Sequence, residues 1–470
     1  MSLRFPISRL SCLLLAALLT GCGDLPDARS AWVCNALAED NEVMLGRDAG
    51  RVEAKLQSMT ADPYLWFRGT AGLFYREVVQ PSNGWVFAGT ASAEASDVQL
   101  VGDAHIENIG TYLDESGMLR AEFNDFDGAG FGAFWVEVWR LATSFALLDR
   151  AGLAAGSPEV GRVWAGWVAE GYAEGALSEA ERALRPVVDN GEGGPLLADL
   201  FSKAREKGGE RDELADETFV SSGERKFRYA ALPERQPLNA DLLIEPSTAE
   251  RALAEHIYRS LLSSEAPTPG ALLGVARRQG AGIASMPNLR LYLLLDGVTE
   301  GREDDVILEA KELLDPPIWL DPRRGDNWSA SEQGERVVQA QLALQGQPRA
   351  DRWLGSFRDG QMAFRIRHYT DFQAELDHED VGALARSGAA ARLLAQTAGR
   401  LLARSHMQAP LRGGGDAMQV IQSAITGRRE AFVEQVQEVA VAMSLRTVAD
   451  LERFREAGAI EDCVSPWRKP

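Results

Sequence analysis

Two short acidic segments carry the side chains best suited to chemistry in this chain. The first, Gly102–Asn108, reads GDAHIEN, and the second, Asn124–Gly128, reads NDFDG. Carboxylate and amide oxygens are the ligands that Mg²⁺ prefers, and a further carboxylate in the same site can orient or deprotonate a hydroxyl group. The alternative is that both segments are turns, since Asp, Asn and Gly are common in turns. Because two such segments lie close together in the chain, we favour a metal-dependent site.

Two predicted strands position these segments. Asp97–Val101 reads as a buried strand that leads into the first segment, and Leu119–Phe123 reads as a strand that leads into the second. Between them Asp114–Gly117 is a turn signal. We therefore expect a hairpin of these two strands to bring the acidic side chains together.

A second region combines a glycine-containing loop with a lysine in an apolar strand. Gly280 and Gly282 precede a predicted antiparallel pair of strands, and Lys311 ends the second of these. An ammonium group in an apolar strand is costly unless it is paired. Glu335, on the predicted helix that follows, is the expected partner. The alternative is a surface lysine at a strand end beside an ordinary loop glycine.

The acidic segments resemble the catalytic loop of aminoglycoside phosphotransferases and related kinase-like enzymes. That family's pattern is His-Gly-Asp-x-His-x-x-Asn followed by Ile-Asp-Phe, and here Val101 stands in place of the first His. The resemblance implies that Asp103 is the catalytic aspartate, that Asn108 and Asp125 hold Mg²⁺, and that Asp127 adds a further acidic ligand.

The same resemblance gives roles to the other polar residues. Kinases place a glycine-rich hairpin and then a lysine against the phosphates of the nucleotide, so Gly280, Gly282 and Lys311 become cofactor-binding candidates, with Glu335 as the partner of the lysine. His105 is expected to brace the loop. Arg68, between aromatic residues, either contacts a phosphate or the acidic site, or is a structural arginine stacked on aromatic rings.

Across most of its length the chain more closely resembles the domain-of-unknown-function 2252 family, a name that carries no activity. The resemblance spans roughly residues 60–410 and is specific in the order of its motifs. The matching stretches are Trp66–Gly69, Val101–Gly110, Asn124–Gly128, Arg140–Ser144, Gly280–Ser285, Glu309–Glu312, Gly334–Val338 and Leu402–His406.

The order of these motifs differs from that of an ordinary kinase, in which the glycine loop and the lysine precede the catalytic aspartate. The helix that ends at His406 resembles the one that directly precedes the catalytic loop in phosphotransferases, so joining it to Val101 restores the usual order. We therefore expect an α+β, two-lobed protein-kinase-like fold that is circularly permuted and has added helices. The expected lobes are 61–265 for the catalytic loop, 266–375 for a β-rich nucleotide lobe and 376–470 for helices that complete the catalytic lobe.

The N-terminus has the features of an export signal. Residues 1–21 combine two arginines with a short apolar run, as secretory signal peptides do. The motif that ends at Cys22 resembles the bacterial lipobox, which implies lipidation of Cys22 and a tether with a helix over 22–60. The expected location is the periplasmic face of the outer membrane. Cys34 and Cys463 form either one disulfide or two unpaired thiols.

Composition and charge narrow the function. The chain has 470 residues and a formal net charge of −20, so it is a poor general binder of nucleic acid. The leading hypothesis is a Mg²⁺-dependent phosphotransferase of small-molecule-kinase type that uses ATP or another phosphorylated donor and a hydroxyl acceptor. One alternative is a non-catalytic kinase-like lipoprotein that binds a ligand or envelope partners. The other is a metal-dependent hydrolase that uses Asp103, His105, Asp125 and Asp127.

Overall fold

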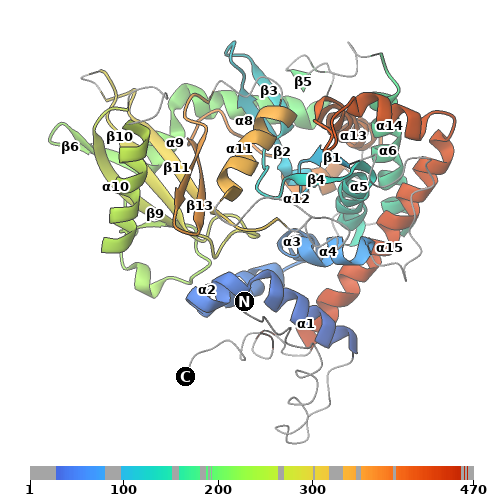
Figure 1. Cartoon of the computed structure of the whole chain (residues 1–470), viewed down its shortest axis with the longest axis horizontal. Helices are drawn as coiled ribbons and strands as arrows, with labels where there is room; N and C mark the ends of the chain where they lie inside the picture. Colours follow the sequence, from blue (N-terminus) through green and yellow to red (C-terminus); the bar gives the residue numbers. More distant parts are fainter. Residues whose placement is uncertain are drawn as a thin grey trace, which may run out of the picture.

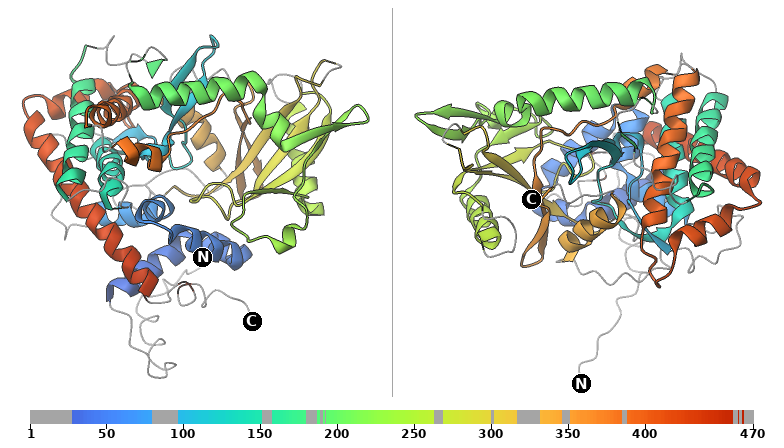
Figure 2. Two further views of the ribbon diagram at one scale, coloured as in Figure 1. Left: turned by 180° about the vertical axis from the view of Figure 1, so that it is seen from behind. Right: turned by 90° about the horizontal axis from the view of Figure 1, so that it is seen from above.

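The computed structural model describes an α+β fold in which helices lie on one side and an antiparallel sheet lies on the other (Figure 1). The described residues are 28–79, 97–150, 158–179, 187–188, 191, 193–262, 269–299, 302–316, 332–345, 351–384, 388–456, 460 and 463. Views from behind and from above show the same separation of helices from sheet (Figure 2).

The helical side is built around the largest hydrophobic core. Its main helices are α5 (Phe134–Arg150), α6 (Pro158–Ala176), α13 (Gly388–Gln408), α14 (Ala417–Ile425) and α15 (Arg429–Glu456). Helices α6 and α13 approach each other at glycines, since a Cβ on Gly399 would lie 2.1 Å from the carbonyl oxygen of Val168. The helix that ends near His406 is therefore fixed in the core.

A six-stranded sheet forms the other side, with the strand order β12-β13-β11-β10-β9-β8. All neighbouring strands are antiparallel. The strands are β8 (Leu242–Ile244), β9 (Leu272–Gln279), β10 (Arg290–Leu295), β11 (Val306–Leu313), β12 (Gly355–Asp359) and β13 (Met362–His368). Strand β8 precedes residue 266, so the sheet begins earlier in the chain than the expected β-rich lobe.

Alternating side chains give this sheet two different faces. One face packs on α10 (Thr248–Leu262) through an apolar cluster that includes Ile257, Leu291 and Phe364. The opposite face carries a second apolar cluster that contains Tyr292 and a group of charged side chains that contacts the rest of the molecule.

Three small sheets complete the strands. They are β1 (Asp97–Leu100) with β4 (Gly130–Ala133), β2 (Ile109–Leu113) with β3 (Leu119–Phe123) and β5 (Val187–Val188), and β6 (Thr218–Ser221) with β7 (Glu224–Phe227). The expected pairing of β1 with β3 is therefore wrong. The turn at Asp114–Gly117 instead joins β3 to β2, because the segment directly before the turn is itself a strand. Strand β1 pairs with β4.

The remaining helices are shorter or peripheral. They are α3 (Pro63–Gly69), η4 (Ile106–Asn108), α4 (Ala71–Val78), α8 (Pro195–Glu210), α9 (Asp212–Glu217), η5 (Pro233–Arg235), α11 (Gln333–Leu344) and α12 (His378–Ala383). Asp62 caps α3 by accepting hydrogen bonds from the first backbone N–H groups of that helix.

Two N-terminal helices, α1 (Ala28–Asp40) and α2 (Glu42–Met59), lie across the base of both sides (Figure 1). From α1, Arg29 donates to Asp450 of α15 at 2.8 Å, and from α2, Arg47 pairs with Glu312 of β11. These contacts connect the sheet to the helical side through the first helices of the described chain.

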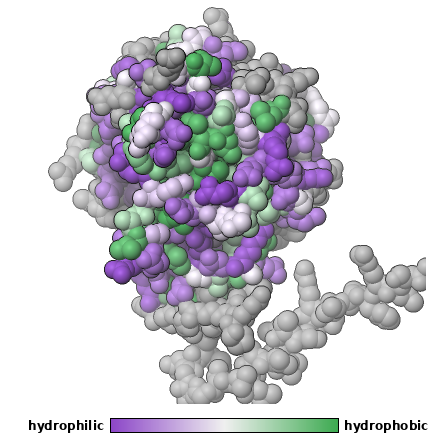
Figure 3. All heavy atoms as spheres, turned by 90° about the vertical axis from the view of Figure 1, so that its left-hand side faces the viewer, coloured by the Kyte–Doolittle hydropathy of each residue, from purple (hydrophilic) through white to green (hydrophobic). Residues whose placement is uncertain are grey.

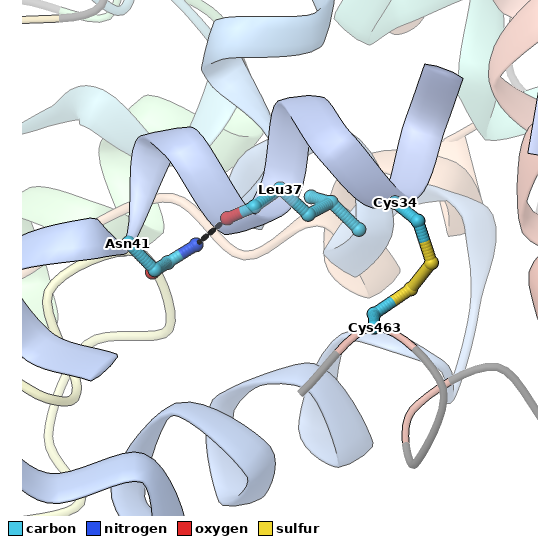
Figure 4. Close-up of a disulfide and its surroundings, with 4 residues drawn as sticks. All are labelled: Cys34, Leu37, Asn41 and Cys463. Carbon is cyan, nitrogen blue, oxygen red and sulfur yellow. Dashed lines mark hydrogen bonds between the residues drawn. A yellow bond between two sulfur atoms is a disulfide. The ribbon is translucent and has the colours of Figure 1, made fainter. Parts of the chain in front are cut away.

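A disulfide joins Cys34 of α1 to Cys463, with 5.1 Å between the two Cα atoms (Figure 4). Directly after α1, the side chain of Asn41 donates to the carbonyl oxygen of Leu37 at 2.7 Å. Of the two alternatives for these cysteines, the structure therefore contains the bonded pair.

The surface on the sheet side is mostly hydrophilic, with smaller hydrophobic areas between the polar ones (Figure 3). Scattered apolar surface of this kind is ordinary for a folded chain. Among the described residues, no helix combines the length and apolarity that a bilayer span requires.

Candidate functional site

The first acidic segment is held by its backbone. A Cβ on Gly102, where φ is +101°, would lie 1.8 Å from the carbonyl carbon of Gly128, so the two acidic segments touch at their glycines. Glu137 of α5 accepts hydrogen bonds from the N–H groups of Val101, at 2.9 Å, and Gly102. His406 Nε2 lies 2.8 Å from the same carboxylate. The end of α13 is thus connected to this loop.

The two segments are also joined through their polar side. The backbone N–H of Asn124 donates to the carbonyl oxygen of Asn108 at 3.0 Å. The side-chain amide of Asn108 donates to the carbonyl oxygen of Asp103 at 2.6 Å. The sequence expectation that the two acidic segments meet therefore agrees with the geometry, although the strands that bring them together pair differently.

Asp103 is paired with a buried arginine. Its Oδ1 accepts from Arg140 of α5, whose guanidinium lies 4.1 Å from the centre of the Phe67 ring. Its Oδ2 lies 3.9 Å from His105 Nε2. Burial raises the pKa of Asp103, and the charge of Asp125 adds to this while Arg140 opposes it. Asp103 is therefore a fixed carboxylate with one oxygen, Oδ2, not engaged by the arginine.

His105 is buried behind this carboxylate. Its Nδ1 lies 3.5 Å from the hydroxyl of Tyr64, and burial together with the charges of Arg68 and Arg140 lowers its pKa well below the ordinary value. A neutral imidazole wedged between Tyr64 and Asp103 fits the expectation that His105 braces the loop.

The carboxylate of Asp125 accepts few hydrogen bonds from the described part of the protein. Within the described residues its one hydrogen bond is from the backbone N–H of Asp127 to Oδ1, at 3.1 Å, and it forms no ion pair. Nearby, Asn124 donates from its side chain to Glu375 at 3.2 Å. Asp125 and the side chain of Asn108 carry oxygen donors of the kind that Mg²⁺ prefers, and Asp103 lies close enough for the charge of Asp125 to raise its pKa. Glu375 is a neighbour that sequence reasoning missed.

Lys311 pairs with Asp127, not with Glu335. Asp127 lies between Lys311 of β11 and Arg365 of β13, with Arg365 Nη1 at 3.0 Å. Although burial raises the pKa of Asp127, these two cations lower it well below its ordinary range. Asp127 was expected as a metal ligand, but its carboxylate is already engaged by two cations.

The register of α11 explains why the expected glutamate is wrong. Glu335 is exposed, whereas its neighbour Arg336 is 1% exposed and points inward. Arg336 donates to the carbonyl oxygen of Asp127 at 2.8 Å and also to that of Ala129. Helix α11 therefore supports the second acidic segment through an arginine on its buried face.

The two glycines of the β9–β10 loop differ in what surrounds them. Both have positive φ values, +76° for Gly280 and +72° for Gly282. A Cβ on Gly280 would lie 2.2 Å from the carbonyl oxygen of Ala240, so a close backbone contact explains this glycine. A Cβ on Gly282 would lie 3.4 Å from Arg290 Nη2. Gly282 is therefore beside a cation of the sheet.

Arg68 belongs to a second polar group on the far side of the loop. It pairs with Glu107, which also accepts from His378 Nδ1 and, at 3.1 Å, from the backbone N–H of His378. The His378 ring stacks on Tyr64 with 4.4 Å between ring centres. Burial lowers the pKa of His378, but the bond to Glu107 outweighs it and raises the value. Of the two readings of Arg68, the structure shows the pairing with an acidic residue.

His378 was missed in the sequence because it has no recognisable motif around it. In the described part of the chain, Glu107, Asp377 and His378 are the group of acidic and histidine side chains whose ligand atoms lie close enough together for a metal ion. Glu107 is already bonded to Arg68 and His378, so these contacts by themselves account for the group.

Sequence reasoning also missed the charged residues that surround Lys311. Arg290, Arg365 and Arg367 project from β10 and β13, and Glu309 lies two residues before Lys311 on β11. Their signal is visible in the sequence: charged residues recur at every second position of otherwise apolar strands, which places them on one face.

Comparison with models of protein families matches residues 47–457 to the family described as "Uncharacterized protein conserved in bacteria (DUF2252)". No curated protein and no solved structure matches the chain. Cys22 and the expected signal peptide lie outside the described residues.

Proposed function

The chain belongs to the DUF2252 family of bacterial proteins, and we propose from the site itself that it is a Mg²⁺-dependent phosphotransferase of small-molecule-kinase type acting on a hydroxyl acceptor. The observation that carries the proposal is the ion pair between Asp127 and Lys311. It joins the acidic segments to the lysine strand, the two motifs that phosphoryl transfer requires in one site.

The residues present fit a magnesium site of the kind that substrates complete. Mg²⁺ is usually held by one or two carboxylates and by the phosphates of the substrate rather than by a full cage of protein ligands. Asp125 and Asn108 would hold the ion, and the ion when bound would neutralise charge on the transferred phosphate. Asp127 is assigned to Lys311 instead of to the metal, because its carboxylate already contacts two cations.

Asp103 would orient the acceptor hydroxyl. Arg140 fixes one carboxylate oxygen of Asp103, which leaves Oδ2 to accept a hydrogen bond from the substrate. Because burial raises the pKa of Asp103, this carboxylate is a better proton acceptor than an ordinary exposed aspartate. Lys311 would contact the phosphates from the sheet side.

A circularly permuted kinase-like arrangement accounts for the order of these parts. The hairpin β9–β10 with its glycine loop is followed by β11 with Lys311, as in a kinase nucleotide lobe. The end of α13 is next to the acidic loop: His406 reaches Gly102 through Glu137, and Gln99 donates to the carbonyl oxygen of Pro410 at 3.1 Å. Well-separated positions for His406 and Asp103 would have argued against permutation, and they are close together.

The proposed location is the cell envelope, with a lipid on Cys22 as the anchor and the periplasmic face of the outer membrane as the favoured side. The disulfide between Cys34 and Cys463 supports export, because disulfides persist in oxidising compartments. ATP is one candidate donor, and another phosphorylated compound is the alternative in that compartment. Incorporation of labelled palmitate into the wild type, and not into Cys22→Ala, would test the anchor.

Calorimetric titration of the purified full-length protein with ATP and Mg²⁺ tests the proposed activity. Asp125→Asn and Lys311→Ala are both expected to weaken binding at least tenfold, whereas Glu335→Gln, on the exposed face of α11, is expected to leave it unchanged. Binding that neither Asp125→Asn nor Lys311→Ala weakens, with all variants folded, would refute a shared nucleotide site. No binding at all would favour the non-catalytic lipoprotein. The hydrolase alternative requires His105 as a metal ligand, so loss of Mg²⁺ binding in a folded His105→Gln variant would support it.

A further inference from the structure

The charged face of the sheet contains a row of like charges. In the strand register, Lys311 of β11 lies directly opposite Arg290 of β10 on one side and directly opposite Arg365 of β13 on the other. Three cations across three neighbouring strands repel one another, and like charges at opposed positions destabilise a sheet. Arg367, two residues along β13 from Arg365, extends the row on the same face.

Two carboxylates contact these four cations. Glu309, which is 1% exposed, lies 3.0 Å from Arg367, 3.3 Å from Arg365 and 3.4 Å from Arg290. Asp127 contacts Lys311 and Arg365. Among the described residues, the ion pairs of this cluster join four cations to two carboxylates, so the cluster has two more positive than negative charges.

Some donors in the cluster are not used by the protein. Arg365 is 2% exposed, yet its Nε has no hydrogen-bond partner. Among the described residues, Arg367 bonds to Glu309 through Nε alone, so its two terminal nitrogens are available, and its side chain is 20% exposed. Buried ion clusters contribute little to stability compared with apolar packing, so stability alone does not explain four cations here.

We propose that Arg290, Arg365 and Arg367 form, together with Lys311, a binding site for the phosphate chain of the donor. This inference rests on the proposed phosphotransferase activity and names the ligand class of the same site. Arginine suits this task because its planar group donates two parallel hydrogen bonds to one phosphate. Gly282 lies beside Arg290, whose Nη2 is 3.3 Å from Ser285 Oγ, so the glycine loop also brings a hydroxyl group next to this cation.

The cluster adjoins the second acidic segment, because Asp127 of that segment contacts both Lys311 and Arg365. Burial lowers the pKa of Arg367, but the carboxylates of Glu309, Asp125 and Asp127 outweigh it and raise the value. Arg367 therefore lies in the field of Asp125, the proposed magnesium ligand. Binding of Mg²⁺ at Asp125 adds two more positive charges, and an anion between Asp125 and the sheet then balances the site.

Recognition through the phosphate chain makes no use of a base or a sugar. Nucleoside triphosphates and inorganic polyphosphates share this chemistry, so the site accepts either source. The distinction matters for a protein of the cell envelope, where the donor need not be a nucleotide. Comparison of ATP, inorganic tripolyphosphate and adenosine separates the two sources.

Titration calorimetry of the purified full-length protein with tripolyphosphate, with and without Mg²⁺, tests the inference. Arg367→Gln is expected to weaken tripolyphosphate binding about ten- to a hundredfold, because it removes a charged hydrogen-bonding group. Arg290→Gln is a second variant for the same effect. Arg278→Gln is the matched control, because Arg278 is an arginine of the same sheet that lies outside the cluster. It projects from β9, 6.0 Å from the centre of the Tyr292 ring, and pairs with Asp241 and Glu217.

Thermal unfolding distinguishes binding from structure. The melting temperature of Arg367→Gln is expected to fall, because the variant loses its ion pair with Glu309, so affinities are compared at a temperature at which both proteins are folded. A purely structural role would lower the melting temperature and leave the affinity of the folded protein unchanged, which would overturn the inference.

The outcomes separate this inference from the proposed activity. Tripolyphosphate binding that Arg367→Gln weakens and Arg278→Gln does not supports the phosphate site, even if no phosphate transfer is found. ATP binding that Asp125→Asn weakens, with no binding of tripolyphosphate, overturns the phosphate-chain site and leaves the phosphotransferase standing. Equal weakening by Arg278→Gln also overturns it, since a general loss of positive charge then explains the effect.

Discussion

Glu137 offers the sharpest test of how the acidic loop is joined to the helices. Its buried carboxylate accepts from the N–H groups of Val101 and Gly102 and contacts His406, so one side chain connects α5, the loop and α13. In Glu137→Gln the one remaining side-chain oxygen can still accept hydrogen bonds from the N–H of Val101 and from His406. The amide nitrogen then faces the N–H of Gly102, and that donor is left without an acceptor.

The expected loss follows from these three contacts. A buried donor without a partner costs about 1–3 kcal/mol, and each of the other two bonds weakens by about 1 kcal/mol when the acceptor loses its charge. We therefore expect Glu137→Gln to lower the free energy of unfolding by about 3–5 kcal/mol. Urea unfolding measures this value, and Glu430→Gln, an exposed residue in the first turn of α15, is the control with a change below about 0.5 kcal/mol.

A double-mutant cycle with His406→Gln isolates the junction between α13 and the loop. Residues in direct contact are expected to show a coupling of about 0.5–3 kcal/mol, and the pair lies at 2.8 Å. Additive effects of the two substitutions, or a loss below about 1 kcal/mol for Glu137→Gln alone, would refute the view that this carboxylate holds the helix to the loop. The support for a permuted arrangement would then be lost.

Three further predictions concern stability. Burial lowers the pKa of Lys55 from 10.5 to about 8, which corresponds to a cost of about 3 kcal/mol for the charged form. Lys55→Met is therefore expected to stabilise the protein by about 1–3 kcal/mol at pH 7. In urea unfolding the wild type should become more stable between pH 8 and 10.5, and the variant should not. The hydrogen bond to Glu107 raises the pKa of His378 above 6.5, so the stabilisation from this pair is complete below pH 6.5 and is lost as the pH rises through the folded-state pKa. The difference in unfolding free energy between the wild type and His378→Gln should therefore be larger at pH 5.5 than at pH 8.5. A constant difference would contradict the pairing. Replacing both Cys34 and Cys463 by Ser is expected to cost about 2–4 kcal/mol by thermal unfolding without changing Mg²⁺·ATP affinity, and a changed affinity would show that the bond acts on the site.

Much of the fold was predictable because its elements have clear periodicity. The predicted strands at Asp97–Val101 and Leu119–Phe123 agree closely with β1 and β3 of the structure. The partner of β3 was not predictable from the strand pattern, because the segment before the turn is short and contains Gly110. Pairing depends on contacts that a single strand does not encode.

The site shows the same division. Motif order identified Asp103, Asn108, Asp125 and Lys311, and the structure places all of them in one region. The partner of Lys311 was mistaken because neighbouring helix residues face opposite ways, and α11 turns an arginine inward instead of Glu335. A sequence states which residues are near in the chain, but the rotation of a helix about its axis depends on packing.

The position of α1 and α2 has a consequence for how the molecule is oriented. If Cys22 carries the proposed lipid, the five residues between it and Ala28 let the two residues lie at most about 20 Å apart. The N-terminal end of α1 must then stay within that distance of the bilayer, and Cys34 with its disulfide lies six residues further along this helix. This short connection would therefore keep the protein close to the membrane and restrict which of its faces a membrane-bound acceptor can approach.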